Sequence, residues 1–141
     1  WQQPEETARA LADGWFHTGD GGVIGEDGYL TISDRKKDVI ITGGENVSSI
    51  EVEDAIFSHP EVAEVAVIGV PFPHSGEAPM AFVVARDPSL TAEELRHFAH
   101  ELLTGYKVPR YIEFRAELPK TNVGKILRRE LRDPLWAGVK R

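Results

Sequence analysis

The feature that most constrains this chain is a run of four charged residues, Asp-Arg-Lys-Lys, at positions 34–37. Charged side chains of these types are rarely buried, so the run cannot belong to a hydrophobic core. Strand-like apolar stretches flank it, at residues 28–33 before the run and 38–42 after it. The pattern predicts a surface link between two packed pieces, and we place a domain boundary there.

The composition excludes several classes of protein. The 141 residues carry 16 Lys and Arg against 23 Asp and Glu, a net charge of −7, which argues against a nucleic-acid partner. With no cysteine, disulfides, cysteine-ligated zinc and cysteine nucleophiles are excluded. The five histidines show no metal-ligand spacing, so no metal site is expected.

The sequence shows no targeting signal that we recognise. No apolar run approaches the ~20 residues that a membrane span needs. The first residue is Trp1 rather than Met, and no basic leader follows it. We therefore expect a cytoplasmic protein fragment that begins at a cut end and has no transmembrane segment.

The charges are unevenly distributed along the chain. Residues 1–103 contain 6 basic and 19 acidic side chains, whereas residues 104–141 contain 10 basic and 4 acidic ones. Such a basic segment is usually a solvated surface. It could alternatively meet an anion such as a phosphate, and composition does not decide between the two.

After the boundary, helical and strand patterns alternate. Capping-box spacing at Ser48 with Glu51, and again at Thr91 with Glu94, marks the starts of two helices. The predicted order is strand 38–42, a helix after residue 48, strands 62–70 and 80–85, a helix after residue 91, strand 111–114 and a short basic helix 126–131. We expect Pro71 and Pro73 to stop the strand at 62–70. This mixture predicts an α+β fold, a small two-layer α/β sandwich.

Three stretches are unusual for a purely structural domain. The first is Thr-Gly-Asp-Gly-Gly at 18–22. Its simpler interpretation is a glycine-rich turn with a side-chain hydrogen bond. Its functional interpretation is that the Asp20 carboxylate accepts two hydrogen bonds from a diol such as ribose.

The second stretch runs from Arg35 to Asn46. Gly43 and Gly44 could simply supply positive φ angles in a tight turn. Alternatively, their missing side chains let a ligand approach the backbone. Arg35 could donate hydrogen bonds to a ribose or a phosphate.

The third stretch, residues 118–127, is a polar loop bracketed by Lys120 and Lys125. Single lysines are usually just solvated. Here Lys125 stands where a flexible cationic point charge could reach phosphate or carboxylate oxygens. The spacing is not that of a P-loop, so a Walker site is rejected.

Taken together and in this order, these stretches resemble the adenylate-forming superfamily of acyl-CoA synthetases, peptide-synthetase adenylation domains and beetle luciferases. The matching motifs are residues 14–20, 34–38, 43–47 and 119–125. The resemblance implies four segments: residues 1–34 as the end of a large N-terminal AMP-binding domain, 35–37 as a hinge, 38–132 as a small C-terminal lid and 133–141 as a tail.

The resemblance also implies a two-step reaction. A carboxylic acid reacts with ATP to give an acyl-adenylate, and coenzyme A then displaces AMP. Asp20 and Arg35 would hold the ribose hydroxyls, and Lys125 would contact the reacting oxygens during adenylation. Lys37 would be the hinge of a domain rotation. The turn at residues 43–45, with Gly43, Gly44 and Glu45, would then line the coenzyme A channel, while Mg²⁺ would be bound mainly by the large domain on which the lid packs.

Within the superfamily, residues 105–109 and 124–129 resemble the acyl-CoA synthetase branch. Luciferases carry a lysine where Gly43 stands. One departure is the pair His74 and Ser75, where the branch usually has a tryptophan or an arginine. A peptide-synthetase adenylation domain, or a non-catalytic binding or oligomerisation module, are the alternatives. Because the phosphate loop and the acyl pocket would lie upstream, we expect residues 1–141 alone to be inactive.

Overall fold

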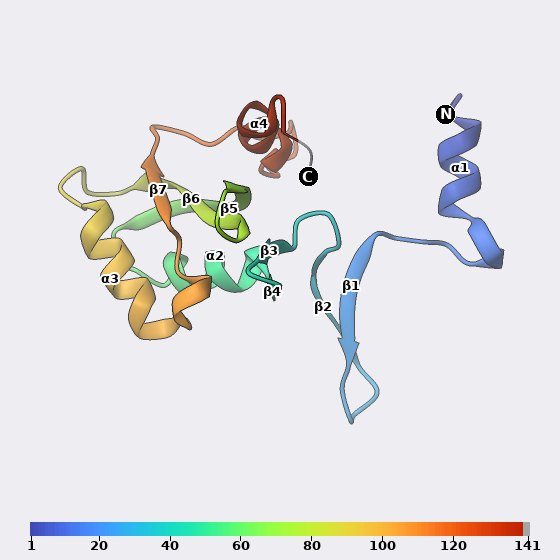
Figure 1. Ribbon diagram of the computed structural model, residues 1–141, viewed down its shortest axis with the longest axis horizontal. Helices are drawn as coiled ribbons and strands as arrows, with labels where there is room; N and C mark the ends of the chain where they lie inside the picture. Colours follow the sequence, from blue (N-terminus) through green and yellow to red (C-terminus); the bar gives the residue numbers. More distant parts are fainter. Residues whose placement is uncertain (140–141) are drawn as a thin grey trace. The chain divides into compact units, whose positions relative to one another are not determined.

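The computed structural model describes residues 1–139 and divides the chain into two compact units, Trp1–Lys37 and Asp38–Arg141 (Figure 1). The division follows the last residue of the charged run from which the boundary was predicted. Each unit has its own sheet, so each is described separately.

The first unit contains one helical segment and one β-hairpin. Helix α1 (Pro4–Ala10) has its proline in the first turn, where no backbone N–H is needed. A 3₁₀ turn, η1 (Ala12–Gly14), follows. Strands β1 (Asp20–Ile24) and β2 (Leu30–Arg35) pair in antiparallel fashion. The strand predicted at 28–33 is therefore present as β2, displaced by two residues.

The turn predicted at residues 18–22 is wrong in its second half. Asp20 begins β1, and the ladder has a bulge between Gly21 and Gly22. The glycine is needed there because a Cβ on Gly22 would lie 2.8 Å from the carbonyl oxygen of Thr31. The glycines thus permit a close strand pairing, where the sequence suggested a loop.

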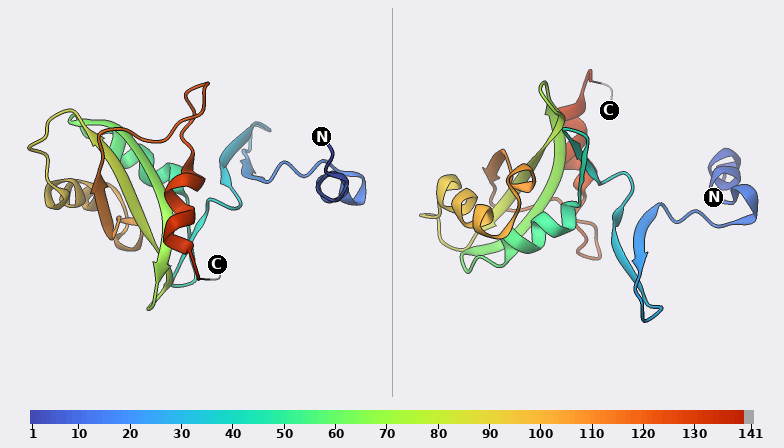
Figure 2. Two further views of the ribbon diagram at one scale, coloured as in Figure 1. Left: turned by 90° about the horizontal axis from the view of Figure 1, so that it is seen from above. Right: turned by 60° about the horizontal axis from the view of Figure 1, so that its bottom comes forward.

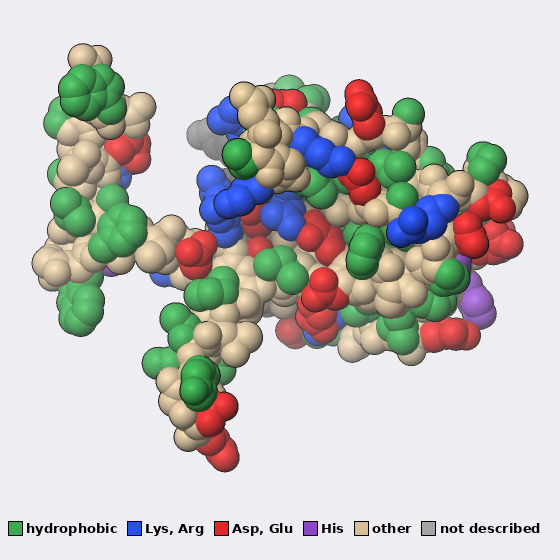
Figure 3. All heavy atoms as spheres, turned by 180° about the vertical axis from the view of Figure 1, so that it is seen from behind, with side chains coloured by type: hydrophobic (Ala, Val, Ile, Leu, Met, Phe, Trp, Pro, Cys, Tyr) green, Lys and Arg blue, Asp and Glu red, His purple; other side chains and the backbone are tan. Residues whose placement is uncertain are grey.

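The first unit buries almost nothing by itself. All residues of the unit are described, and Asp34 is its one buried residue. Since Asp34 also lies within β2, the prediction that the whole charged run 34–37 is a surface link is wrong at its first residue. Figure 3 shows hydrophobic side chains, in green, on the surface of one face of the molecule. The large apolar side chains exposed on this unit include Trp1, Trp15, Phe16, Val23, Ile24 and Leu30. A two-stranded hairpin without a core is marginally stable at best. The unit therefore lacks the packing of an independent domain.

The second unit is built on a five-stranded mixed sheet. Its strands are β3 (Ile40–Thr42), β4 (Glu45–Val47), β5 (Val62–Phe72), β6 (Gly76–Ala85) and β7 (Tyr111–Phe114). They are ordered β4-β3-β6-β5, and β7 pairs with β6 in parallel while the other pairs are antiparallel. The helical elements are α2 (Ser49–Phe57), α3 (Ala92–Leu102), η2 (Gly105–Lys107), α4 (Arg128–Arg132) and η3 (Asp133–Trp136).

Alternate side chains of the sheet point to opposite faces and belong to two different hydrophobic clusters. On β5, Val65 and Val67 join the cluster that includes Val52 of α2 and Leu95 of α3. Their neighbours face the opposite cluster with Leu131 of α4. Figure 2 shows α2 and α3 on one face of the sheet and α4 on the other. The predicted α+β fold is confirmed: the sheet and the α2–α3 layer are the two principal layers, and α4 adds partial cover.

The helix starts agree with the sequence signals. At α3 both halves of the capping box are formed by Thr91 and Glu94, and at α2 the Ser48 hydroxyl accepts a hydrogen bond from the Glu51 N–H. Along α3, Leu95 is fully buried, whereas Leu102 is 55% exposed.

Several element ends differ from the predictions. Strand β5 continues through Pro71 to Phe72. Because β5 is the last strand in the sheet order, a residue without an N–H is tolerated there. Its partner β6 begins at Gly76, four residues before the predicted start, and β4 was not predicted at all.

The predicted tail is partly packed. Residues 133–136 form η3, and the Trp136 indole N–H donates to the carbonyl oxygen of Gly69 on β5 at 2.9 Å. The second unit therefore continues beyond residue 132, while residues 140–141 of that predicted tail lie outside the described part of the chain.

Candidate functional site

Asp20 and Arg35, which the sequence separates by a hairpin, are cross-strand partners on β1 and β2. The Arg35 Nε lies 3.6 Å from the Asp20 Oδ1. The Arg35 side chain is 62% exposed and that of Asp20 is 33% exposed. An ion pair this solvated is weak, so both groups can exchange it for hydrogen bonds to a ligand.

Hydrogen bonds donated by backbone N–H groups fix the ends of this hairpin. The Asp20 N–H donates to the Thr18 hydroxyl at 3.1 Å, and the buried Asp34 carboxylate accepts from the Arg35 N–H at 2.7 Å. The Lys36 N–H donates to the carbonyl oxygen of Gly19 at 2.8 Å. Lys37, which follows, is exposed and ends the first unit. A hinge at Lys37 stays a prediction.

Gly43 and Gly44 form a two-residue hairpin turn between β3 and β4, here named the glycine turn (residues 42–45). Their φ angles are 60° and 87°, a conformation that favours glycine at both positions. A Cβ at either position would meet no atom within 4 Å. The backbone conformation thus explains the glycines, and the turn also leaves open space for a ligand.

Hydrogen bonds to the β5–β6 connection and to β6 fix the glycine turn and the strand before it. The Gly43 N–H donates to the carbonyl oxygen of Ser75 at 2.9 Å, in the β5–β6 connection. The buried Glu77 carboxylate accepts from the Ile41 N–H at 3.3 Å. Glu45, the remaining predicted ligand-binding residue of this region, is exposed at the start of β4.

Residues 119–127, here named the Lys125 loop, close on themselves. The Leu127 N–H donates to the carbonyl oxygen of Pro119 at 2.8 Å. The Thr121 N–H donates to the carbonyl oxygen of Lys125 at 2.8 Å, and the Lys125 N–H donates to the Thr121 hydroxyl at 3.1 Å. Gly124, with φ 81°, allows the reversal.

The two lysines of this loop have different surroundings. The Lys120 ammonium lies 2.6 Å from the Glu64 carboxylate on β5. Lys125 is exposed, and its ammonium has no ion-pair partner within residues 1–139. Lys125 is therefore the lysine of this loop that can meet an external anion.

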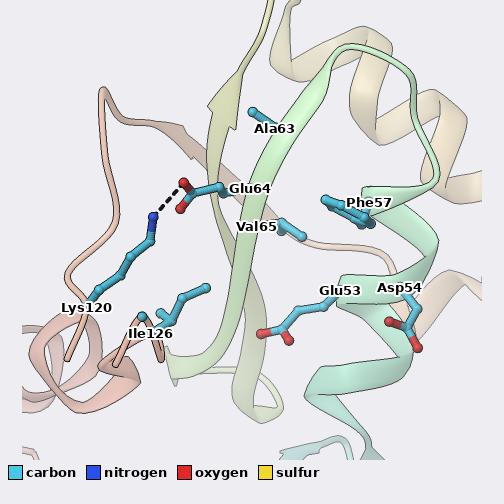
Figure 4. A pocket seen from close by; sticks show the side chains of 9 residues that line it. Glu53, Asp54, Phe57, Ala63, Glu64, Val65, Lys120 and Ile126 are labelled. Carbon is cyan, nitrogen blue, oxygen red and sulfur yellow. Dashed lines mark hydrogen bonds and ion pairs between the residues drawn. The ribbon is translucent and has the colours of Figure 1, made fainter. Parts of the chain in front are cut away.

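A cavity of about 390 Å³ lies beside the loop, between α2 and β5 (Figure 4). It is lined by Glu53, Asp54, Phe57, Ala63, Glu64, Val65, Lys120, Gly124 and Ile126. At its edge the Glu53 carboxylate pairs with Arg128, the first residue of α4. The sequence pattern pointed to neither glutamate, because each meets its partner only through the fold.

Lys107, in the stretch 105–109, also forms an ion pair with a carboxylate. Its ammonium lies 2.6 Å from Glu51, and this hydrogen bond raises the pKa of Lys107. In the part of the chain that the structure covers, no three His, Asp or Glu side chains gather closely enough to hold a metal ion. Among the same residues, no helix has both the length and the apolar character needed to cross a bilayer.

Comparison with known proteins gives consistent matches over this chain. The model of the family described as "AMP-binding enzyme C-terminal domain" matches residues 51–125. The chain is 58% identical over 133 residues to the long-chain-fatty-acid–CoA ligase of Escherichia coli O6:H1, covering 94% of the chain and 24% of that protein. It is 45% identical over 134 residues to the peroxisomal trans-cinnamate:CoA ligase of Petunia hybrida, with the same coverages.

A solved structure agrees with these relatives. The ATP-bound crystal structure of MatB from Rhodopseudomonas palustris superimposes with a TM-score of 0.86 at 38% identity, covering 95% of the chain and 27% of that protein. The chain thus spans about a quarter of the length of the proteins it matches.

Proposed function

The chain belongs to the family of AMP-binding enzyme C-terminal domains, and from that premise we propose that it is the C-terminal part of an ATP-dependent acid–CoA ligase. The observation that carries the proposal is the exposed ammonium of Lys125, which has no ion-pair partner among the described residues and stands on a self-closed loop. The Asp20–Arg35 pair and the glycine turn supply the other two features that such an enzyme requires.

In the first step, a carboxylate oxygen of the substrate attacks the α-phosphorus of ATP, and pyrophosphate leaves. Negative charge is shared among the phosphoryl oxygens during this exchange, and a fixed cation lowers its energy. We assign that cation to Lys125. The Asp20 carboxylate accepts hydrogen bonds from the ribose hydroxyls, and Arg35 donates to the same hydroxyls.

In the second step, the sulfur of coenzyme A attacks the acyl carbonyl carbon and AMP leaves. We assign the approach of the coenzyme to the glycine turn, because a Cβ on Gly43 or Gly44 would meet no described atom within 4 Å. Between the two steps, the small domain rotates about the exposed residue Lys37. This rotation removes the Lys125 loop from the reacting groups and brings the glycine turn to them.

The acid is proposed at the level of its class. The relatives named for long-chain fatty acids and for trans-cinnamate each align with 94% of this chain. We therefore assign the acid pocket to the part of those proteins that this chain does not cover, and infer the acid only from overall relatedness. The higher identity to the fatty-acid enzyme favours a fatty acid as substrate.

The test is an assay of the full-length protein with ATP, coenzyme A and a panel of carboxylic acids. We expect AMP, pyrophosphate and an acyl-CoA to form with a fatty acid. Amino-acid-dependent pyrophosphate exchange without any acyl-CoA would support a peptide-synthetase adenylation domain. No turnover with any acid would support a non-catalytic module. Residues 1–141 alone should form no acyl-CoA.

A further inference from the structure

We propose that Glu53 and Arg128 are a positioning pair that fixes the Lys125 loop to the body of the small domain, an inference that rests on the adenylation role proposed for Lys125. Arg128 directly follows the loop at the start of α4, and Glu53 belongs to α2. Seventy-five positions separate them in the sequence.

The Glu53 carboxylate joins three elements of the domain. Its Oε1 accepts from the Arg128 Nε at 3.0 Å and its Oε2 from the Arg128 Nη2 at 2.6 Å. Oε1 also accepts from the Val67 N–H of β5 at 2.8 Å. Two parallel charge-assisted bonds specify orientation as well as distance. Glu53 thus ties the end of the Lys125 loop to a helix and to the sheet.

The loop has a second, more solvated anchor. Figure 4 shows Lys120 reaching Glu64 on β5, while the Glu53 carboxylate points toward the same loop. The side chains of Lys120 and Glu64 are 38% and 33% exposed, against 26% and 14% for Arg128 and Glu53. Solvent screens the exposed pair more strongly, so the Arg128–Glu53 pair is the main anchor.

Placement of the loop matters because Lys125 acts through the position of one ammonium group. A displacement of about 1 Å at a reacting centre can cost roughly hundredfold in rate. The tip of the loop has little packing of its own, since Val123 is 80% exposed. The two ends therefore determine where the Lys125 backbone stands.

The experiment measures the two half-reactions separately in the full-length protein carrying Glu53→Gln or Arg128→Gln. Glu53→Gln keeps an oxygen for the Val67 N–H but removes the charge that holds the guanidinium. We expect each variant to slow adenylation about tenfold and to leave thioester formation from supplied acyl-adenylate unchanged. The double variant should be no slower than either single one, because both remove one interaction.

Asp54→Asn and Arg129→Gln are matched controls, since each changes an exposed neighbour on the same helix. Equal losses in both half-reactions would reduce the pair to a merely structural contact and overturn the inference. A slow Arg128→Gln beside a normal Glu53→Gln would also overturn it, because Arg128 would then act directly on the substrate. Normal adenylation in both variants would have the same consequence.

Lys125→Ala separates this inference from the proposed function. If Lys125→Ala adenylates normally, the proposed function itself fails. If Lys125→Ala is impaired while Glu53→Gln is not, the positioning pair alone fails. As a readout independent of turnover, the amides of Lys125 and Leu127 should exchange hydrogen faster in Glu53→Gln than in Asp54→Asn, and equal exchange would contradict the anchor.

Discussion

The Lys125 loop and the glycine turn belong to the same small domain, but different interactions hold them. Main-chain pairing of β3 and β4 fixes the glycine turn, together with the hydrogen bond from Gly43 to Ser75. Charged side chains tie the Lys125 loop to the domain, through Arg128 and Lys120. The turn is therefore part of the sheet, whereas the loop can be loosened without unfolding the sheet. Substitutions in the Lys125 loop and in the glycine turn should therefore differ in their effects on stability and on the two half-reactions.

The largest expected effect comes from Lys125→Ala in the full-length protein. Removing one preorganised charge-stabilising group costs roughly 10²–10³-fold in rate. The loss should fall on adenylation, measured by pyrophosphate release, and spare the conversion of supplied acyl-adenylate to thioester. Val123→Ala is the control within the same loop, since that side chain is 80% exposed. Comparable losses in both half-reactions would refute the role assigned to Lys125.

Lys37→Pro should show the opposite division between the half-reactions. Proline locks φ and so restricts the backbone rotation that the proposed domain movement needs. We expect thioester formation to slow by about tenfold or more while adenylation continues. Lys36→Ala, beside it in the charged run, should change neither rate. Wild-type rates in both half-reactions of Lys37→Pro would remove the hinge from the mechanism.

Gly44→Val tests the glycine turn. A β-branched residue at φ 87° is strained, which should destabilise the domain by about 1–3 kcal/mol in thermal or denaturant unfolding. Gly44→Asn tolerates this backbone region better and adds a side chain to space that the domain leaves open.

The asparagine variant separates the two interpretations of these glycines. If the turn lines a coenzyme A path, Gly44→Asn should be nearly as stable as the wild type and still slow in thioester formation. Normal thioester formation in a stable Gly44→Asn would leave backbone conformation as the sole reason for glycine.

The smallest expected effect is that of Thr91→Ala, which removes the capping box of α3. This helix start belongs to neither the Lys125 loop nor the glycine turn. Hydrogen bonds from the Thr91 side chain and backbone lower the pKa of Glu94 below its ordinary value of 4.5. A depressed folded-state pKa means that the stabilisation is present above the unfolded-state pKa and is lost as pH falls through the folded-state value. Thr91→Ala should raise the Glu94 pKa, as followed by NMR titration.

Thr91→Ala also serves as a reference for substitutions in the Lys125 loop and in the glycine turn. The stability difference between wild type and Thr91→Ala should be constant near neutral pH and shrink below about pH 4.5, as the carboxylate becomes protonated. Both half-reactions at neutral pH should be unchanged. A selective loss in one of them would show that α3 is coupled to that site.

Local signals in the sequence determined the elements whose ends depend on neighbouring residues. The capping box at Thr91 starts α3, the run at 111–114 is strand β7, and the charged residues 34–37 stand where the two compact units divide. The spacing of the motifs also pointed to Asp20, Arg35 and Lys125, because each lies in a short stretch with an unusual composition.

Only the tertiary structure decided which distant residues meet. Strand β4 is too short to show a pattern and exists because β3 offers it a partner. Pro71 can lie in β5 because that strand is at the edge of the sheet. Glu53 meets Arg128 because α2 and α4 both pack against β5, and nothing within either helix indicates the other. Local propensity acts over a few residues, whereas a salt bridge depends on where the folded chain brings its partners together.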